Sequence, residues 1–184
     1  MASEVKVIDE FLPPDMWVNL TDNMGFNGKS NNFPWFYMPY VTYNDTHYME
    51  LEKESAGQFT HLFWDPNQGG TDTFQIIQPA LQMLEVYSII RIKANMQLRT
   101  GTTQQNALHR DTGDFPIDCT TMILYMNTNN GYTHFEDGTK IESVANRLCF
   151  FPNHMLHGSA TCTDEKFRSV INFNLHCKDP ESWH

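Results

Sequence analysis

The stretch RSVINFNL (168–175) near the end of the chain carries the pattern that decides the fold. Successive side chains of a β-strand point to opposite faces of a sheet. One face of this strand is mostly apolar: Ser169, Ile171, Phe173 and Leu175. The other is mostly polar: Arg168, Val170, Asn172 and Asn174. We expect the first face to pack in a hydrophobic core and the second to line a functional site.

Short runs of the same kind, separated by turns, fill the second half of the chain. They are SIIRIKANMQ (88–97), ALHRD (107–111), TTMILYMN (120–127), YTHFED (132–137), TKIES (139–143), RLCFFP (147–152) and LHGSATC (156–162). Asp137-Gly138 is a strong hairpin-turn signal between two of them. Strands at this spacing predict an antiparallel sandwich or barrel, here a cupin-like jelly roll.

The first half is more irregular and contains the expected helices. VKVIDEFLPPDMWVNLTDNM (5–24) indicates a short strand, a Pro-Pro start and an amphipathic helix. A second helix is expected from Phe74 to about Tyr87, capped by Asp72 or Thr73 and kinked or restarted at Pro79. Aromatic islands at 33–43 and 59–64 suit either a lid or groove wall, or packing beneath long loops.

Length and composition narrow the class of protein. A chain of 184 residues with 40% hydrophobic content predicts one domain over 1–184, with a helical and loop region at about 1–87 and a β core at about 88–177. The charged N-terminus and the absence of an apolar run of about eighteen residues predict a cytoplasmic protein without a membrane partner. A net charge of −10 argues against a nucleic-acid partner.

The cysteines fit the same compartment. Cys119, Cys149, Cys162 and Cys177 are too far apart for a CxxC pair and lie in or near expected strands. We therefore expect buried thiols rather than disulfides.

His109 and Asp111 in ALHRD form an HxD pattern. If this segment is a strand, both side chains lie on one face, where they can share a metal ion. Two histidines and one carboxylate with open positions are typical of non-haem iron(II) oxygenases. Among the downstream histidines His134, His154, His157 and His176, the best third ligand is His157, which follows an apolar strand and a Pro turn. Arg168 comes eleven residues later and could bind a carboxylate through two hydrogen bonds.

Several segments together resemble a known superfamily. They are HRD (109–111), ILYMN (123–127), GYTHF (131–135), NRLCFFPNHMLHG (146–158) and Arg168 of the last strand. This set is similar to the 2-oxoglutarate/Fe(II)-dependent oxygenases, in the prolyl-4-hydroxylase-like branch, and to members found on bacteriophage genomes. The resemblance covers about residues 88 to 176. It implies a double-stranded β-helix, in agreement with the strand pattern.

The resemblance also implies roles for individual residues. His109, Asp111 and His157 would bind Fe(II). Arg168 and the hydroxyl of Tyr125 would both bind the distal carboxylate of 2-oxoglutarate. The formal charges of iron, Asp111, 2-oxoglutarate and Arg168 then cancel, as a closed pocket of low dielectric requires.

Two positions depart from the family pattern. Gln97 stands where branch members often carry a tyrosine, which changes how the co-substrate is flanked. Val170 stands where many relatives have Ser or Thr, so one carboxylate contact is either missing or supplied by Asn172.

The activity implied is hydroxylation of an unactivated C–H bond with O₂ and 2-oxoglutarate, with ascorbate as a further candidate cofactor. The resemblance implies as substrate either a prolyl residue in a peptide or a small molecule. If the chain is phage-encoded, it would act in the cytoplasm of a host cell. Two other classes stay open: a cupin-like binding or structural module, and a metal-dependent isomerase or dioxygenase that ignores 2-oxoglutarate. His134 and His154 are solvated, core-packed or ligand-orienting, and His61 is a candidate for the substrate mouth.

Overall fold

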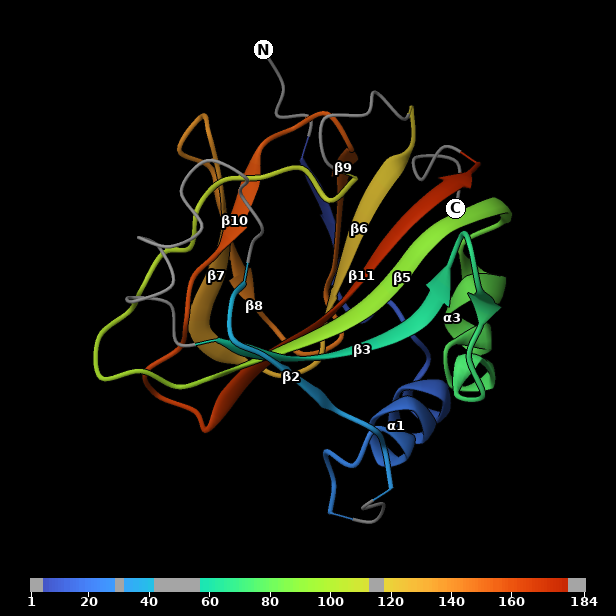
Figure 1. The fold of residues 1–184 in the computed structure, drawn as a ribbon, viewed down its shortest axis with the longest axis horizontal. Helices are drawn as coiled ribbons and strands as arrows, with labels where there is room; N and C mark the ends of the chain where they lie inside the picture. The colour runs from blue at the N-terminus through green and yellow to red at the C-terminus, as the bar shows by residue number, and fades with distance from the viewer. Residues whose placement is uncertain (1–4, 29–31, 42–56, 113–117, 179–184) are drawn as a thin grey trace.

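Two antiparallel sheets make up most of the computed structural model, which describes residues 5–28, 32–41, 57–112 and 118–178 (Figure 1). The larger sheet has the order β1 (Lys6–Ile8), β9 (Leu148–Pro152), β6 (Thr120–Tyr125), β11 (Phe167–Cys177), β5 (Val86–Leu98), β3 (Gln58–Asp65) and β2 (Phe36–Met38), with β4 (Gly69–Gly70) paired to β3. The smaller sheet has the order β10 (His157–Ser159), β7 (Asn129–Phe135) and β8 (Lys140–Ser143). This arrangement confirms a mainly β, jelly-roll-like fold.

The large sheet buries apolar side chains on both faces. On one face, Ile171 and Phe173 of β11 lie in a core cluster with residues of β5, β6 and the helices, and both are 0% exposed. A second cluster includes Val170, Ile123 and Phe135 and joins the larger sheet to the smaller one. The predicted apolar face of 168–175 therefore packs as expected, and full burial of one such side chain stabilises the fold by about 1.5–3 kcal/mol.

The first helix, α1 (Pro14–Asn23), begins at a proline as predicted and buries Leu20 against the large sheet. The second prediction was wrong in extent. Instead of one helix over 74–87, a 3₁₀ turn η1 (Phe74–Ile76) is followed by the short helix α3 (Gln78–Met83), after which β5 begins. Pro79 lies at the start of α3, because proline fits the first turn of a helix but not its interior.

The predicted strand at 107–111 does not form. His109 makes only an isolated bridge with His157, and Asp111 lies in a turn. Before β5, the predicted short strand forms as β1 and the two aromatic islands contribute β2 and β3, and all three strands pair within the large sheet.

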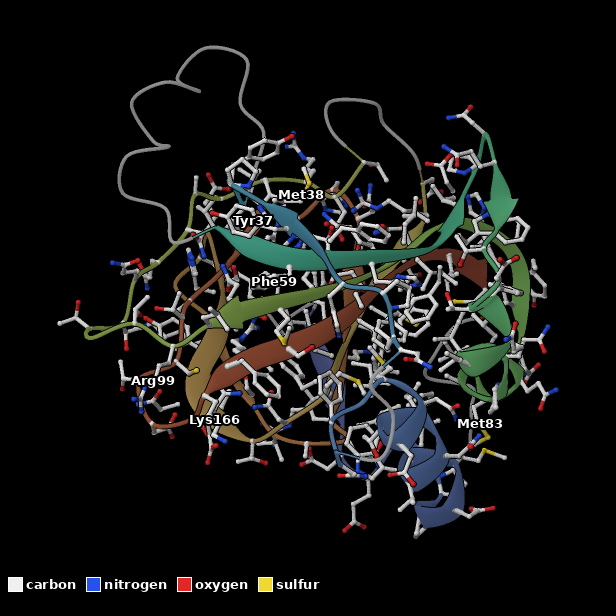
Figure 2. All side chains as sticks on the ribbon, turned by 60° about the horizontal axis from the view of Figure 1, so that its bottom comes forward. Tyr37, Met38, Phe59, Met83, Arg99 and Lys166 are labelled. Carbon is white, nitrogen blue, oxygen red and sulfur yellow. The ribbon has the colours of Figure 1, made fainter. Side chains whose placement is uncertain are left out.

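The aromatic islands pack against the core only in part. Phe33 and Trp35 pack against the core, whereas Phe36 and Tyr37 of β2 are each 60% exposed. Tyr37 lies beside Phe59 of β3, with ring centroids 5.6 Å apart (Figure 2). Residues 42 and 43 lie outside the described residues.

The four cysteines form no disulfide, in agreement with the prediction from their spacing. Among the described residues, no helix is long and apolar enough to cross a membrane.

Candidate functional site

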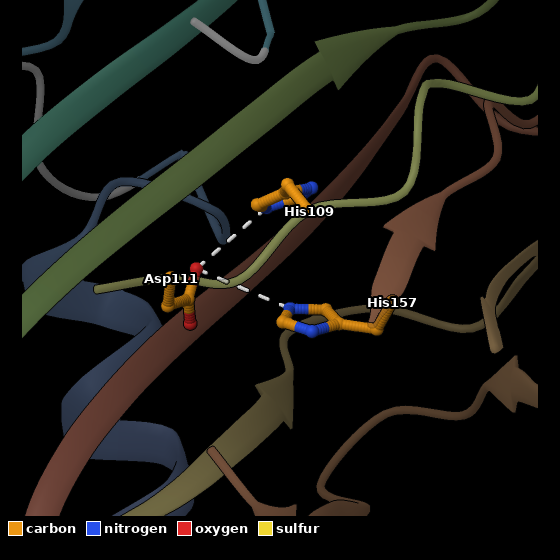
Figure 3. Close-up of side chains that lie close together, drawn as sticks. All are labelled: His109, Asp111 and His157. Atoms are coloured by element: carbon orange, nitrogen blue, oxygen red, sulfur yellow. Dashed lines mark ion pairs between the residues drawn. The ribbon is translucent and has the colours of Figure 1, made fainter. Parts of the chain in front are cut away.

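Three side chains from two separate parts of the chain converge between the two sheets (Figure 3). Nε2 of His109 lies 3.7 Å from Oδ1 of Asp111, and Nε2 of His157 lies 4.0 Å from the same oxygen. One potential ligand atom from each residue falls within 4.8 Å of the others. The side chains of Asp111 and His157 are buried, while that of His109 is 30% exposed. The predicted triad is thus brought together, open on the His109 side.

The main chain sets the spacing of the two imidazoles. The amide of His109 donates to the carbonyl of His157 at 2.9 Å, and the amide of His157 donates back at 3.1 Å. The ring centroids are 4.9 Å apart. The three side chains come together as expected, but His109 and Asp111 do not share a strand face as predicted. A single antiparallel bridge instead aligns His109 with His157.

Each imidazole is oriented so that its Nε2 is available. Nδ1 of His109 lies 3.3 Å from the carbonyl oxygen of Ala107, and Nδ1 of His157 lies 3.3 Å from that of Met155. A carbonyl beside Nδ1 favours the tautomer with the proton on Nδ1 and the lone pair on Nε2. Nε2 of His157 is buried and has no hydrogen-bond partner among the described residues. An orphaned nitrogen beside a carboxylate fits a metal ligand, and this donor set suits Fe(II).

Two neighbours hold the carboxylate of Asp111. Nη2 of Arg91 lies 3.0 Å from Oδ1, and Nδ2 of Asn174 donates to Oδ2 at 3.1 Å. Burial alone would raise the pKa of Asp111, but the hydrogen bond with His109 and the charge of Arg91 hold it well below its usual range. Burial lowers the pKa of His157. An ionised carboxylate and a neutral imidazole are the states in which both residues bind metals.

Arg168 provides a buried cation on the neighbouring part of β11. Its side chain reaches from the large sheet toward the smaller one, where Nε donates to Ser143 Oγ at 2.9 Å and Nη2 donates to Thr133 Oγ1 at 3.0 Å. Arg168 is 3% exposed, and its burial lowers the pKa of the guanidinium. Among the described residues no carboxylate pairs with it. Its hydrogen-bond partners are neutral hydroxyls, so the charge remains available for an incoming carboxylate.

Tyr125 packs against this arginine and does not line the described cavity, so its contact with the carboxylate of 2-oxoglutarate stays a prediction. Its ring lies 5.5 Å from the guanidinium carbon, and its hydroxyl donates to Thr133 Oγ1 at 2.8 Å. The side chain is fully buried, and burial raises the pKa of its hydroxyl. Gly131 leaves room for the arginine, because a Cβ there would lie 2.8 Å from Arg168 Cδ.

A cavity of 360 Å³ joins the metal ligands to Arg168. Gln97 and Asn172, the positions that depart from or compensate for the family pattern, both line it. The side-chain carbonyl oxygens of these two residues have no hydrogen-bond partner among the described residues. Both are therefore placed to contact a bound molecule.

Sequence reasoning missed several residues of the site. Arg91 and Lys93 of β5 line the cavity, and Thr133 and Ser143 bind Arg168. The alternation of polar and apolar residues in RIKANMQ (91–97) was the available signal, because its polar members all face the cavity.

His61 and His134 make structural contacts away from the metal ligands. His61 is buried, with Nδ1 2.8 Å from the Pro34 carbonyl and Nε2 2.6 Å from Thr73 Oγ1, and it does not line the described cavity. The prediction that His61 lines the substrate mouth is therefore wrong. His134 lies on β7 opposite Gly158 of β10, with Nε2 3.1 Å from the Asn106 carbonyl oxygen.

Comparison with known proteins gives a likeness in structure but not in sequence. No family model matches the chain, and no curated protein matches its sequence. A prolyl hydroxylase from Trichoplax adhaerens, in complex with a hypoxia inducible factor peptide fragment, has a TM-score of 0.61 at 11% identity, over 95% of this chain and 84% of the other.

Two further solved structures agree with this likeness. The viral collagen prolyl hydroxylase of Paramecium Bursaria Chlorella virus-1, in its 2OG complex, has a TM-score of 0.56 at 14% identity, covering 96% of this chain and 98% of that one. An oxidoreductase of the 2OG-Fe(II) oxygenase family from Burkholderia pseudomallei has a TM-score of 0.57 at 10% identity, covering 94% and 85%. The chain therefore has the fold of the prolyl-hydroxylase-like 2-oxoglutarate oxygenases.

Proposed function

We propose that this protein is an Fe(II)- and 2-oxoglutarate-dependent dioxygenase that hydroxylates an unactivated C–H bond. The observation that carries the proposal is that His109, Asp111 and His157 converge in one cavity with the buried Arg168. Among the described residues, His157 Nε2 has no hydrogen-bond partner and Arg168 has no carboxylate partner. A metal triad alone is compatible with many activities. A buried arginine in the same cavity, placed to bind a carboxylate, narrows them to reactions that use an acidic co-substrate. A cupin-like binding or structural module has no use for that arginine, and this alternative is not favoured.

The roles of the residues follow from their contacts. His109, Asp111 and His157 would hold Fe(II), with Arg91 and Asn174 fixing the carboxylate. Arg168 would bind the distal carboxylate of 2-oxoglutarate beside Thr133. When bound, iron and 2-oxoglutarate would supply the oxidising chemistry: one oxygen atom of O₂ enters the substrate as a hydroxyl and the other enters succinate, with release of CO₂.

The surrounding side chains would restrict what else can react. Asp111 occupies the position that a halide would need, so hydroxylation is favoured over halogenation. The cavity is shielded by buried side chains on the Arg168 side and is open on the His109 side, which is where a substrate would reach the metal. We include in the proposal a single oxygenase domain, ascorbate as an auxiliary reductant and a phage-encoded origin, each inferred from the sequence resemblance. A prolyl residue in a peptide is the first candidate substrate, supported by the peptide in the Trichoplax complex.

The test is an anaerobic titration with Fe(II) and then 2-oxoglutarate, followed by visible absorption. A chelated keto acid should give a charge-transfer band in the parent protein. Asp111→Asn and Asp111→Ala should lose the band, whereas Asp118→Ala, at an exposed aspartate outside the triad, should keep it. A parent protein that binds neither Fe(II) nor 2-oxoglutarate, or an Asp111→Ala variant with an undiminished band, would refute the proposal.

A further inference from the structure

The cavity is far more basic than the rest of the protein. The chain has twelve basic and twenty-two acidic residues. Among the described residues that line the cavity, however, four side chains are basic and one is acidic: Arg91, Lys93, Arg110 and Arg168 against Asp111. In an acidic protein, such an excess of cations in one cavity indicates an anionic ligand.

Fe(II) and 2-oxoglutarate do not account for this excess. A divalent cation and a dianion cancel each other, so the lining keeps three positive charges more than negative ones when both are bound. Arg168 is matched by the co-substrate, and Arg91 lies against Asp111 at 3.0 Å. Arg110 donates from Nε to the carbonyl of His154 at 2.8 Å, at an exposed position. Lys93 remains.

Lys93 is a half-buried cation, and no partner for its charge lies among the described residues. Within the described part of the chain, its ammonium makes no hydrogen bond and no salt bridge. Its pKa is lowered to about 8, mainly by burial and also by the charge of Arg91, while the charge of Asp111 offsets part of the effect. The group is thus still largely protonated at neutral pH, in a place where an unpaired charge is costly.

The register of β5 and β11 places Lys93 apart from the co-substrate arginine. Across the two strands, Arg168 is opposite Gln97, Lys93 is opposite Asn172, and Arg91 is opposite Asn174. Four residues of strand separate Lys93 from the Arg168 row, roughly 13 Å at about 3.3 Å per residue. Lys93 is next to Arg91 and thus on the side of the metal ligands, where a substrate carbon would have to come.

We propose that the substrate carries a carboxylate, which Lys93 binds close to the C–H bond that is hydroxylated. This inference rests on the proposed oxygenase function and deepens it by naming the substrate class. The carboxylate belongs either to a free small acid or to an acidic group of a peptide. A cavity of 360 Å³, at the lower end of ordinary ligand pockets, accommodates the co-substrate with one such group.

The experiment compares acids with their amides, which have the same shape without the charge. The protein is loaded with Fe(II) and 2-oxoglutarate without oxygen, and binding is followed by the change that each probe causes in the charge-transfer band. One arm uses N-acetylproline and N-acetylprolinamide as free small molecules. The other uses the capped tripeptides Ala-Glu-Ala and Ala-Gln-Ala. Succinate release in air is the second readout.

In at least one arm, the parent should bind the acid about tenfold or more tightly than the amide, the usual scale for a charge-assisted contact. Lys93→Met should reduce this ratio to about one while leaving the 2-oxoglutarate band intact, and Lys93→Arg should restore most of it. Lys166→Met is the matched control: this lysine is exposed beside Arg99 on a turn outside the cavity, and the ratio should not change (Figure 2).

The possible failures are distinguishable. If the band forms in the parent but neither arm prefers the acid, the carboxylate proposal is overturned while the oxygenase function stands. If Lys93→Met weakens 2-oxoglutarate binding itself, Lys93 belongs to the co-substrate and the proposal is again wrong. If the parent forms no band at all, the oxygenase function fails first.

Discussion

Replacing Arg168 by methionine should separate co-substrate binding from stability. The guanidinium is 3% exposed and donates only to the neutral hydroxyls of Ser143 and Thr133. Removing it loses two modest hydrogen bonds but also removes a charge that burial disfavours. These effects oppose each other, so the melting temperature of the ligand-free variant should stay within about 4 °C of the parent value.

The effect on 2-oxoglutarate should be large. Hydrogen bonds to charged groups contribute about 1.5–3 kcal/mol each, so losing the contacts to a carboxylate should weaken binding by about 100-fold or more. At a concentration 100 times the parent Kd, 2-oxoglutarate stabilises the parent by about 2.7 kcal/mol, or about 5–11 °C. In the variant the same concentration would give about 0.4 kcal/mol, or about 1 °C.

The assay is thermal melting with Mn(II), which avoids oxidation of the metal, with and without 2-oxoglutarate. Arg99→Met, at an exposed arginine just after β5, should keep the full shift (Figure 2). If Arg168→Met also keeps the full shift, Arg168 does not bind the co-substrate. If the variant without ligand unfolds far below the parent, the argument about the cost of its burial is wrong.

Three further changes test the packing and the titration of the fold. Gly131→Ala would place a Cβ 2.8 Å from Arg168 Cδ. The free energy of unfolding in denaturant should therefore fall by about 1–3 kcal/mol, and 2-oxoglutarate should raise the melting temperature by less than in the parent. Gly101→Ala, with open space around it, should show neither effect. Leu124→Ala removes a core side chain that is 0% exposed and should lower the free energy of unfolding by about 2–5 kcal/mol in urea; a loss below 1 kcal/mol would contradict the packing. Burial lowers the pKa of His61 below its ordinary 6.5, so the unfolded chain takes up the proton first and the free energy of unfolding should fall as the pH drops below that value. Urea unfolding at about pH 7.5 and 5.5 should show this fall, and His61→Gln should make it smaller; an equal fall in both proteins would assign it to other groups.

Most of the strands could be predicted because they depend on local pattern, and the HxD pattern together with the family resemblance indicated the metal ligands, although the strand expected at 107–111 does not form. Alternation in 168–175 placed Ile171 and Phe173 in the core and Arg168 and Asn172 at the cavity, and the structure confirms this division. The restart predicted at Pro79 agrees with the start of α3, but the extension to about Tyr87 was wrong, because an apolar stripe does not show that β5 begins at Val86.

The contacts around the ligands could not be predicted, because they depend on register between strands far apart in sequence. Arg91 reaches Asp111, and Asn174 binds the same carboxylate, only because β5 and β11 pair in the observed alignment. A shift of one residue would turn both side chains to the opposite face. Nothing local to position 91 or 174 contains that information.

A metal ion bound at the bridge between His109 and His157 would also stabilise the segment that contains His109. From Gly101 to Asp111 the chain has no regular strand or helix, and it is tied to the β10 side through the bridges Gln105–Ala160 and His109–His157. A metal ion bound by both imidazoles would cross-link the two segments at the His109–His157 bridge. Iron loading should therefore protect this stretch from proteases, so that a starved cell would hold a protein that is both inactive and easier to degrade.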